Sequence, residues 1–143
     1  MSDQLPNRAA TIRLLVVDDD PLHREMISET IKPDGYEVLL AEDGLDALNH
    51  LAEPLPDLII TDLQMPRMSG FELVKVVREK FPTLPVIVIS SEFGEGELPP
   101  HVRADAYLPK AGYTGAQLRA KISELLSAFS NRQQSYPMDI APA

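Results

Sequence analysis

Asp57-Leu58-Ile59-Ile60-Thr61-Asp62-Leu63-Gln64-Met65-Pro66-Arg67-Met68-Ser69-Gly70 is the stretch that decides the fold. Its branched apolar run is long enough for one buried strand and ends on the carboxylate of Asp62. A proline turn and a glycine follow, as is typical of a parallel strand that leads into a helix. Open α/β sheets bind ligands outside the carboxyl ends of their strands. Asp62 is therefore a candidate functional residue, and the alternative is an ordinary capping or loop aspartate.

The pattern of this stretch recurs along the chain. Four further apolar segments are predicted as strands: residues 12–17, 36–41, 85–90 and 106–108. Apolar residues at helical spacing predict the helices between and after them: Leu22, Met26, Ile27 and Ile31; Leu45, Leu48, Leu51 and Ala52; Val74, Val77 and Phe81; Leu118, Ile122, Leu125 and Phe129. Asp20 is expected to cap the first helix before Pro21, and Thr114 with Gln117 forms a capping box for the last. Alternating strands and helices predict an α/β fold, a doubly wound five-stranded parallel sheet of flavodoxin-like order 2-1-3-4-5.

Length and composition narrow the class of protein. The 143 residues fit one domain, which we expect over residues 12–129, after a flexible arm (1–11) and before a disordered tail (130–143). The formal net charge of −9 disfavours binding to nucleic acid or a membrane surface and favours a protein or small-ligand partner, unless the charge serves solubility alone. The absence of cysteine excludes disulfides and thiolate metal sites. With no signal-peptide pattern and no apolar run of membrane-spanning length, a cytoplasmic protein is expected.

Polar side chains stand at or just after the carboxyl ends of four predicted strands. They are Asp18 and Asp19, Asp62, Ser90, and Lys110. Parallel strands share one carboxyl edge, so these groups should converge. Clustered carboxylates repel one another, and Mg²⁺ is the cation that suits such oxygen ligands. A lysine and a serine beside them could stabilise a phosphoryl group. The residues therefore indicate phosphorylation of a carboxylate assisted by a metal.

Four motifs resemble the receiver domain of bacterial two-component response regulators, in its single-domain chemotaxis-regulator form. They are Val16-Val17-Asp18-Asp19-Asp20-Pro21, Asp62-Leu63-Gln64-Met65-Pro66 with Gly70, Val88-Ile89-Ser90-Ser91 and Tyr107-Leu108-Pro109-Lys110. The resemblance runs from about Ile12 to Phe129, with the motifs in order and suitably spaced.

The resemblance implies the roles of the acidic residues. Asp62 would accept a phosphoryl group from the phosphohistidine of a sensor histidine kinase or a phosphotransfer protein. Mg²⁺, or Mn²⁺, would be bound by Asp19, by Asp62 and by the backbone carbonyl of Gln64, with Asp18 assisting through water. The domain would then be no enzyme in the usual sense, because it would catalyse only its own phosphorylation and dephosphorylation.

The resemblance also implies how the aspartyl phosphate would act. Lys110 would pair with Asp62 and then with the phosphoryl group. Ser90 would move to a phosphoryl oxygen and allow Tyr107 to turn inward, so that the added charge alters the surface offered to a downstream target protein. Gln64 and Glu92 would flank the path of the hydrolytic water.

Two features depart from the family pattern. A proline normally follows the lysine, whereas Ala111 follows Lys110 here and Pro109 precedes it, so a cis peptide after the lysine is not expected. The family also has a full helix four, but residues 93–103 contain two glycines and a proline pair. We expect a loop there, with at most a short turn after Pro99. Either the surface that this loop forms is remodelled for a partner, or the loop is a neutral variation of the family pattern.

Other interpretations remain beside the leading one of a stand-alone receiver, whose tail is too short for an output module. One is a pseudo-receiver that binds partners without being phosphorylated. Another is a phosphatase similar to the haloacid dehalogenases with Asp18 as the nucleophile, which Leu22 and the lack of room for a cap domain disfavour. A flavodoxin is disfavoured because acidic residues after the first strand would repel a flavin phosphate.

The three histidines, His23, His50 and His101, lack ligand spacing and are expected to be solvated.

Overall fold

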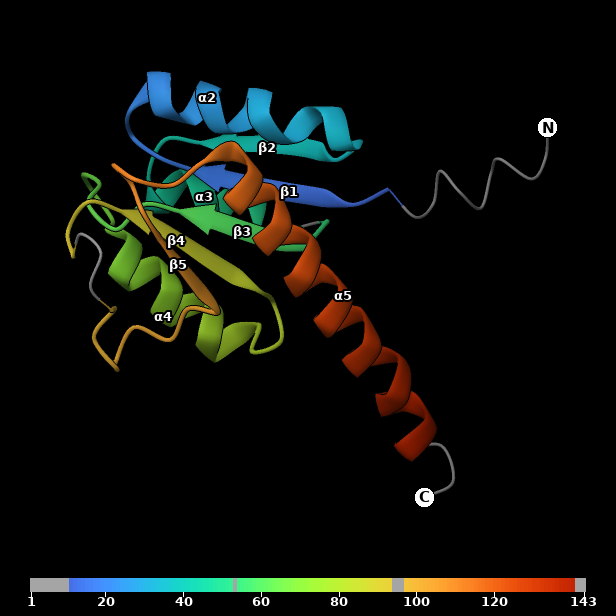
Figure 1. Cartoon of the computed structure of the whole chain (residues 1–143). Helices are drawn as coiled ribbons and strands as arrows, with labels where there is room; N and C mark the ends of the chain where they lie inside the picture. The colour runs from blue at the N-terminus through green and yellow to red at the C-terminus, as the bar shows by residue number, and fades with distance from the viewer. Residues whose placement is uncertain (1–10, 53, 94–96, 141–143) are drawn as a thin grey trace.

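The computed structural model describes the backbone of residues 11–140, except residues 53 and 94–96, and the side chains of this part up to Phe129. Five parallel strands form one sheet of order β2-β1-β3-β4-β5, as predicted (Figure 1). The strands are β1 (Arg13–Val17), β2 (Glu37–Ala41), β3 (Leu58–Thr61), β4 (Val86–Ser90) and β5 (Ala106–Pro109). The helices are α2 (Pro21–Ile31), the short 3₁₀ helix η1 (Lys32–Asp34), α3 (Gly44–His50), α4 (Gly70–Lys80) and α5 (Gly115–Ile140).

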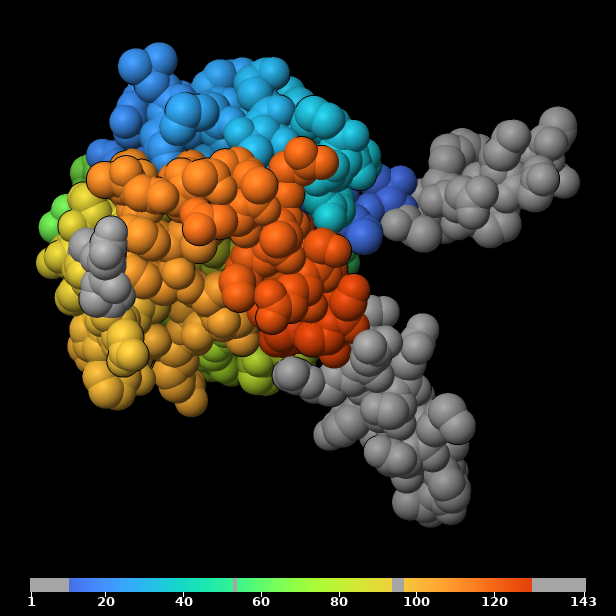
Figure 2. All heavy atoms as spheres, in the orientation of Figure 1, coloured from blue at the N-terminus to red at the C-terminus, as the bar shows by residue number. Residues whose placement is uncertain are grey.

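Helices cover both faces of the sheet, because alternate residues of each strand point to opposite sides. On one face Leu15, Ile59 and Val88 belong to the core that α3 and α4 complete. On the other face Val16 and Ile60 belong to the core that α2 and α5 complete. Figure 2 shows the atoms of α2, in blue, directly against the orange atoms of the chain that leads into α5. The sheet is therefore the buried middle layer of three.

The predicted helix caps are present. The Asp20 side chain accepts a hydrogen bond from the Leu22 N–H, and Pro21 follows it in the first turn of α2. Thr114 and Gln117 exchange side-chain to backbone hydrogen bonds of 2.9 and 3.1 Å at the start of α5. These caps satisfy backbone N–H groups that have no partner inside the helix, and so fix where α2 and α5 begin.

The rotation of α2 and α3 about their axes differs from the prediction. Ile27 and Ile31 are buried as expected, but Leu22 is 81% exposed, Met26 54% and Leu45 46%. A period of 3.6 residues defines an apolar stripe, while the part of the stripe that meets the sheet depends on how the helix packs. Leu22 and Met26 thus lie outside the buried part of the predicted apolar face, and the prediction that Leu45 and Ala52 face inward is wrong.

The segment between β4 and β5 contains no helix among its described residues, 91–93 and 97–105. A turn closes after Pro99, where the Val102 N–H donates to the Pro99 carbonyl oxygen at 2.9 Å. The predicted replacement of helix four by a loop with a short turn is confirmed.

The chain ends differ from the predicted boundaries in one respect. α5 continues to Ile140, so the backbone of residues 130–140 is helical where a disordered tail is expected. Arg132, Gln133 and Gln134 are ordinary helix formers, and extending a helix requires far less than starting one. Residues 1–10 of the expected arm and residues 141–143 lie outside the described part. No helix within the described part combines the length and the hydropathy needed to cross a bilayer.

Candidate functional site

Three carboxylates meet at the carboxyl edge of the sheet. Asp18 and Asp19 directly follow β1, and Asp62 directly follows β3. These strands are neighbours and parallel, with Val17 paired to Thr61 at the end of the register. One ligand atom from each carboxylate lies within 4.8 Å of the others. Asp18 and Asp62 are buried and Asp19 is exposed, so the cluster is open to solvent on one side.

Asp62 is held from both sides of its carboxylate. Its Oδ1 accepts hydrogen bonds from the N–H groups of Leu63 at 2.6 Å and Gln64 at 3.4 Å. Its Oδ2 accepts from Lys110 Nζ at 2.9 Å. The backbone beyond it turns sharply, because the Gly70 N–H donates to the Leu63 carbonyl oxygen at 2.9 Å. A Cβ on Gly70 would lie only 1.9 Å from the Asp62 carbonyl oxygen, which explains the glycine.

Lys110 reaches the cluster although no proline follows it. Its N–H donates to the Ser90 carbonyl oxygen at 3.1 Å, which extends the pairing of β5 with β4 beyond Pro109. Its Nζ also lies 3.5 Å from Asp18 Oδ2. Burial lowers the pKa of this amine, but the hydrogen bond to Asp62 and the charges of Asp18 and Asp62 outweigh that effect and raise it. The ammonium is therefore charged at neutral pH beside the two carboxylates.

Asp18 stays ionised despite its burial. Burial raises the pKa of its carboxyl, but the hydrogen bonds from His23 and from the Asp20 N–H, with the charge of Lys110, hold the pKa below its ordinary value. The two bonds measure 2.6 Å to His23 Nδ1 and 2.9 Å to the Asp20 nitrogen. The site thus presents negative charge at neutral pH.

The donor set fits a hard divalent cation. Carboxylate oxygens are the ligands that Mg²⁺ and Mn²⁺ prefer, and the described residues bring three of them to one place. Asp19 is the most accessible of the three, and none of the hydrogen bonds that hold Asp18 and Asp62 involves its side chain. The geometry therefore allows a cation that keeps some water ligands.

Ser90 is the last residue of β4, and Tyr107 lies within the neighbouring strand β5, on the Lys110 side of the site. Ser90 is buried, and its Oγ accepts a hydrogen bond from the Glu92 N–H at 3.0 Å. The Tyr107 hydroxyl donates to the Ser90 carbonyl oxygen at 3.0 Å. Burial raises the pKa of this phenol, against an opposing hydrogen bond with the Phe93 backbone. Both residues predicted as a switch are therefore linked through one carbonyl group.

A shallow hollow of about 510 Å³ opens beside the carboxylates. Its lining includes Asp19, Gln64, Glu92 and Phe71. The two residues expected to flank the path of a hydrolytic water, Gln64 and Glu92, thus share one hollow with a carboxylate of the cluster.

Sequence reasoning missed two residues of this neighbourhood. His23 is expected to be solvated, but it is buried against Asp18, and that expectation is wrong. The signal was its place in the first turn of α2, five residues after Asp18. Tyr113 contacts His23 from the segment before α5, and no sequence pattern links the two.

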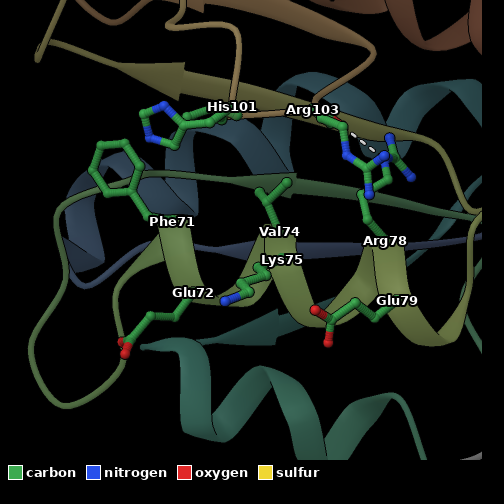
Figure 3. A pocket seen from close by; sticks show the side chains of 9 residues that line it. Phe71, Glu72, Val74, Lys75, Arg78, Glu79, His101 and Arg103 are labelled. Atoms are coloured by element: carbon green, nitrogen blue, oxygen red, sulfur yellow. Dashed lines mark hydrogen bonds between the residues drawn. The ribbon is translucent and has the colours of Figure 1, made fainter.

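A second hollow, of about 440 Å³, lies between α4 and residues 101–103 of the loop that joins β4 to β5 (Figure 3). The rings of Phe71 and His101 stack there with centroids 6.4 Å apart. Arg78 is held beside Arg103 through a hydrogen bond of 2.6 Å from its Nε to the Arg103 carbonyl oxygen. Phe71 also lines the hollow beside the carboxylates, so one side chain borders both.

Comparisons with known proteins agree with this geometry. The family model described as the response regulator receiver domain matches residues 14–123. The response regulator MprA of Mycobacterium bovis is 36% identical over 118 residues, which are 81% of this chain and 51% of that protein. The chain thus spans about half the length of the curated relatives it matches.

Solved structures resemble the chain over most of its length. The chemotaxis response regulator CheY4 of Vibrio cholerae is 31% identical with a TM-score of 0.70, covering 81% of this chain and 99% of that one. The response regulator TrrA of Thermotoga maritima, in complex with Mg²⁺-BeF, is 32% identical with a TM-score of 0.68, covering 80% and 99%.

Proposed function

This chain belongs to the response regulator receiver domain family of two-component systems, and from that premise we propose that Asp62 accepts a phosphoryl group. The donor is the phosphohistidine of a sensor histidine kinase or a phosphotransfer protein. An Asp62 carboxylate oxygen attacks the phosphorus, the bond from phosphorus to the histidine nitrogen breaks, and that nitrogen keeps the electron pair. The product is an aspartyl phosphate.

The contact between Lys110 and Asp62 carries this proposal. Lys110 Nζ lies 2.9 Å from Asp62 Oδ2, within a cluster of three carboxylates that would otherwise repel an incoming phosphoryl group. A fixed ammonium beside the nucleophile stabilises the charge that develops on phosphoryl oxygens. A structural salt bridge would not need two further carboxylates next to it.

A divalent cation completes the charge balance. Asp19, Asp62 and the Gln64 carbonyl oxygen would hold Mg²⁺ or Mn²⁺, and Asp18 would assist through water. When bound, the cation supplies positive charge to the phosphoryl oxygens. The solved relative in complex with Mg²⁺-BeF supports this assignment.

The output is a changed protein-binding surface. Ser90 Oγ leaves the Glu92 N–H for a phosphoryl oxygen, and Tyr107 exchanges its bond to the Ser90 carbonyl for an inward position. Burying the phenol removes an apolar ring from the surface, so the faces before and after phosphorylation differ. The net charge of −9 supports a protein as the downstream partner of this domain rather than nucleic acid.

Intact-mass spectrometry tests the proposal directly. The protein is incubated with Mg²⁺ and acetyl phosphate, beside an Asp62→Asn variant and a sample with EDTA. We expect one phosphoryl adduct on the parent, none on Asp62→Asn and none with EDTA. An adduct that persists in Asp62→Asn would assign the nucleophile elsewhere, with Asp18 the next residue to test. No adduct at any time point would contradict the proposal.

A phosphorylation-independent binding module is the second candidate. The observation that favours it is the hollow beside α4, which residues 101–103 line within the segment where the family has its helix four. Charge reversal of Lys75 and Arg103, which line it, should then abolish signalling output, while Asp62→Asn should preserve it. If Asp62→Asn abolishes signalling output and the charge reversals preserve it, phosphorylation is the signal.

A further inference from the structure

A chain of hydrogen bonds connects the acidic site to the segment that precedes α5. His23 Nδ1 lies 2.6 Å from Asp18 Oδ2, and His23 Nε2 lies 2.8 Å from the Tyr113 hydroxyl. The rings of His23 and Tyr113 meet edge to face, with centroids 5.8 Å apart. The chain therefore ties β1, α2 and the β5–α5 connection together through side chains far apart in the sequence.

The direction of the bond between His23 and Asp18 follows from the groups involved. An ionised carboxylate only accepts, so the hydrogen lies on His23 Nδ1. The other ring nitrogen, Nε2, is in hydrogen-bond contact with the Tyr113 hydroxyl at 2.8 Å. Burial and the charge of Asp18 raise the pKa of this phenol, against the opposing charge of Lys110, so the hydroxyl keeps its proton at neutral pH. Asp18, His23 and Tyr113 are thus joined by two consecutive hydrogen bonds.

The same contacts determine how Asp18 faces the cluster. Its Oδ1 accepts from the Asp20 N–H and its Oδ2 from His23, so both oxygens have a fixed donor. Without these donors, repulsion from Asp19 and Asp62 would favour rotation of the carboxylate away from them. The His23 bond opposes that rotation without bringing a second fixed positive charge next to Lys110.

The segment held by Tyr113 is the one that lacks the family's proline. Ala111 follows Lys110 in this segment. Two long backbone hydrogen bonds hold it locally: the N–H groups of Gly112 and Tyr113 both donate to the Pro109 carbonyl oxygen at 3.2 Å. The Tyr113 hydroxyl adds a hydrogen bond of 2.8 Å to His23, which lies on α2. It therefore restrains the segment that carries Lys110.

We propose that His23 is a positioning residue, held in place by the Tyr113 hydroxyl, that orients the Asp18 carboxylate for binding of a divalent cation. This rests on the proposed function only in assigning a cation to the acidic cluster. It does not require that Asp62 be phosphorylated. Residues that orient metal-site carboxylates affect metal affinity although they do not touch the metal.

Three variants separate positioning from packing. Tyr113→Phe removes one hydroxyl and nothing else. His23→Leu removes the donor to Asp18, whereas His23→Asn places an amide N–H near the position of Nδ1 and so retains it. Tyr36→Phe is the matched control, because Tyr36 is a half-buried phenol in the core beside α2 and not one of the site contacts.

The first measurement is the ¹H–¹⁵N spectrum of the histidine rings in the metal-free protein. We expect a hydrogen on His23 Nδ1 that exchanges slowly with solvent in the parent and in Tyr36→Phe, because Nδ1 lies 2.6 Å from Asp18 Oδ2. In Tyr113→Phe the partner at Nε2 is lost, so the ring is less restrained and this hydrogen should exchange faster. An unchanged exchange rate in Tyr113→Phe would overturn the proposed role of the hydroxyl.

The second measurement is the Mg²⁺ dissociation constant, from calorimetry and amide shifts without any phosphodonor. We expect binding weaker by about 10-fold in His23→Leu, a smaller loss in Tyr113→Phe, and near-parent binding in His23→Asn and Tyr36→Phe. Variants that alter only the melting temperature, with Mg²⁺ affinity within two-fold of the parent, would show a merely structural role. If His23→Leu lowers Mg²⁺ affinity while the parent forms no aspartyl phosphate, the proposed function is contradicted and this inference still holds.

Discussion

Arg67 has a left-handed backbone, with φ of 66°, and its side chain binds the buried carboxylate of Asp43. The Arg67 Nε donates to Asp43 Oδ2 at 2.6 Å, and a second guanidinium nitrogen contacts the same oxygen. Asp43 also caps α3 by accepting from the Asp46 N–H at 2.9 Å. The loop that carries Gln64 is therefore fastened to the start of α3, and the ion pair offsets an unfavourable backbone conformation.

Substitutions at Arg67 should separate the ion pair from the backbone strain. Arg67→Ala and Arg67→Gly both lose the bond to Asp43, but only alanine keeps the left-handed penalty of about 1–2 kcal/mol. Glycine loses part of this advantage through its greater freedom in the unfolded chain. We expect Arg67→Gly to be more stable than Arg67→Ala by about 1 kcal/mol in urea unfolding. Equal stabilities would contradict strain at this position.

The stability contributed by Asp43 should depend on pH. The hydrogen bond from the Asp46 N–H, against the opposing effect of burial and together with Arg67, holds the Asp43 pKa below its ordinary value. A carboxyl with a lowered folded pKa stabilises the fold above its unfolded pKa of about 3.9, and the effect is lost as pH falls through the folded value.

Asp43→Asn should therefore be less stable than the parent at pH 7 and pH 5. Asparagine keeps the cap of α3, so the difference isolates the charge. Urea unfolding at pH 7, 5, 4 and 3 should show the difference shrinking only below about pH 4. A difference that is constant across this range would exclude the ionised pair as its cause.

Gly70→Ala should disrupt the turn after Asp62. The new Cβ would lie 1.9 Å from the Asp62 carbonyl oxygen and 2.7 Å from the Leu63 Cα, so backbone must move. We expect a loss of about 3 kcal/mol or more in the free energy of unfolding. Gly112→Ala is the control, because its nearest neighbour would be the Pro109 Cγ at 4.0 Å. Similar unfolding curves for the two variants would refute the close approach at Gly70.

Lys110→Met should strengthen Mg²⁺ binding and slow phosphorylation by acetyl phosphate. The charged Nζ lies 2.9 Å from Asp62 and 3.5 Å from Asp18, so it repels a cation bound by the same carboxylates. Removing it should tighten Mg²⁺ binding about five-fold, an order-of-magnitude expectation for charges a few ångströms apart near a surface. Lys75→Met, on α4, is the charge-matched control. Weaker Mg²⁺ binding in Lys110→Met would mean that the lysine organises the site more than it repels the cation.

The fold and the acidic cluster could be read from local sequence features. The apolar run ending at Asp62 and the one ending at Asp18 predict parallel strands, and parallel strands end at one edge. The convergence of the three carboxylates therefore follows from local features, without any contact between residues distant in sequence. The capping box of Thr114 and Gln117 and the loop of residues 97–103 were likewise predictable, because both depend on residues close in sequence.

The side chains that hold the site required the tertiary structure. The sequence predicts His23 in solvent, because its partner Tyr113 lies 90 residues away. The helical spacing predicts Leu22 and Leu45 on apolar faces, but the packing of α2 and α3 turns both outward.

The sequence by itself determined the order of strands and helices, the caps of α2 and α5, and the convergence of Asp18, Asp19 and Asp62. These follow from periodicity, turn chemistry and the shared edge of parallel strands, which are all local properties. Only the tertiary structure decided that His23 and Tyr113 hold Asp18, and that Arg67 fastens its loop to Asp43. Such contacts depend on how layers of helices pack on the sheet, and packing is fixed by the shapes of many side chains together rather than by any one segment.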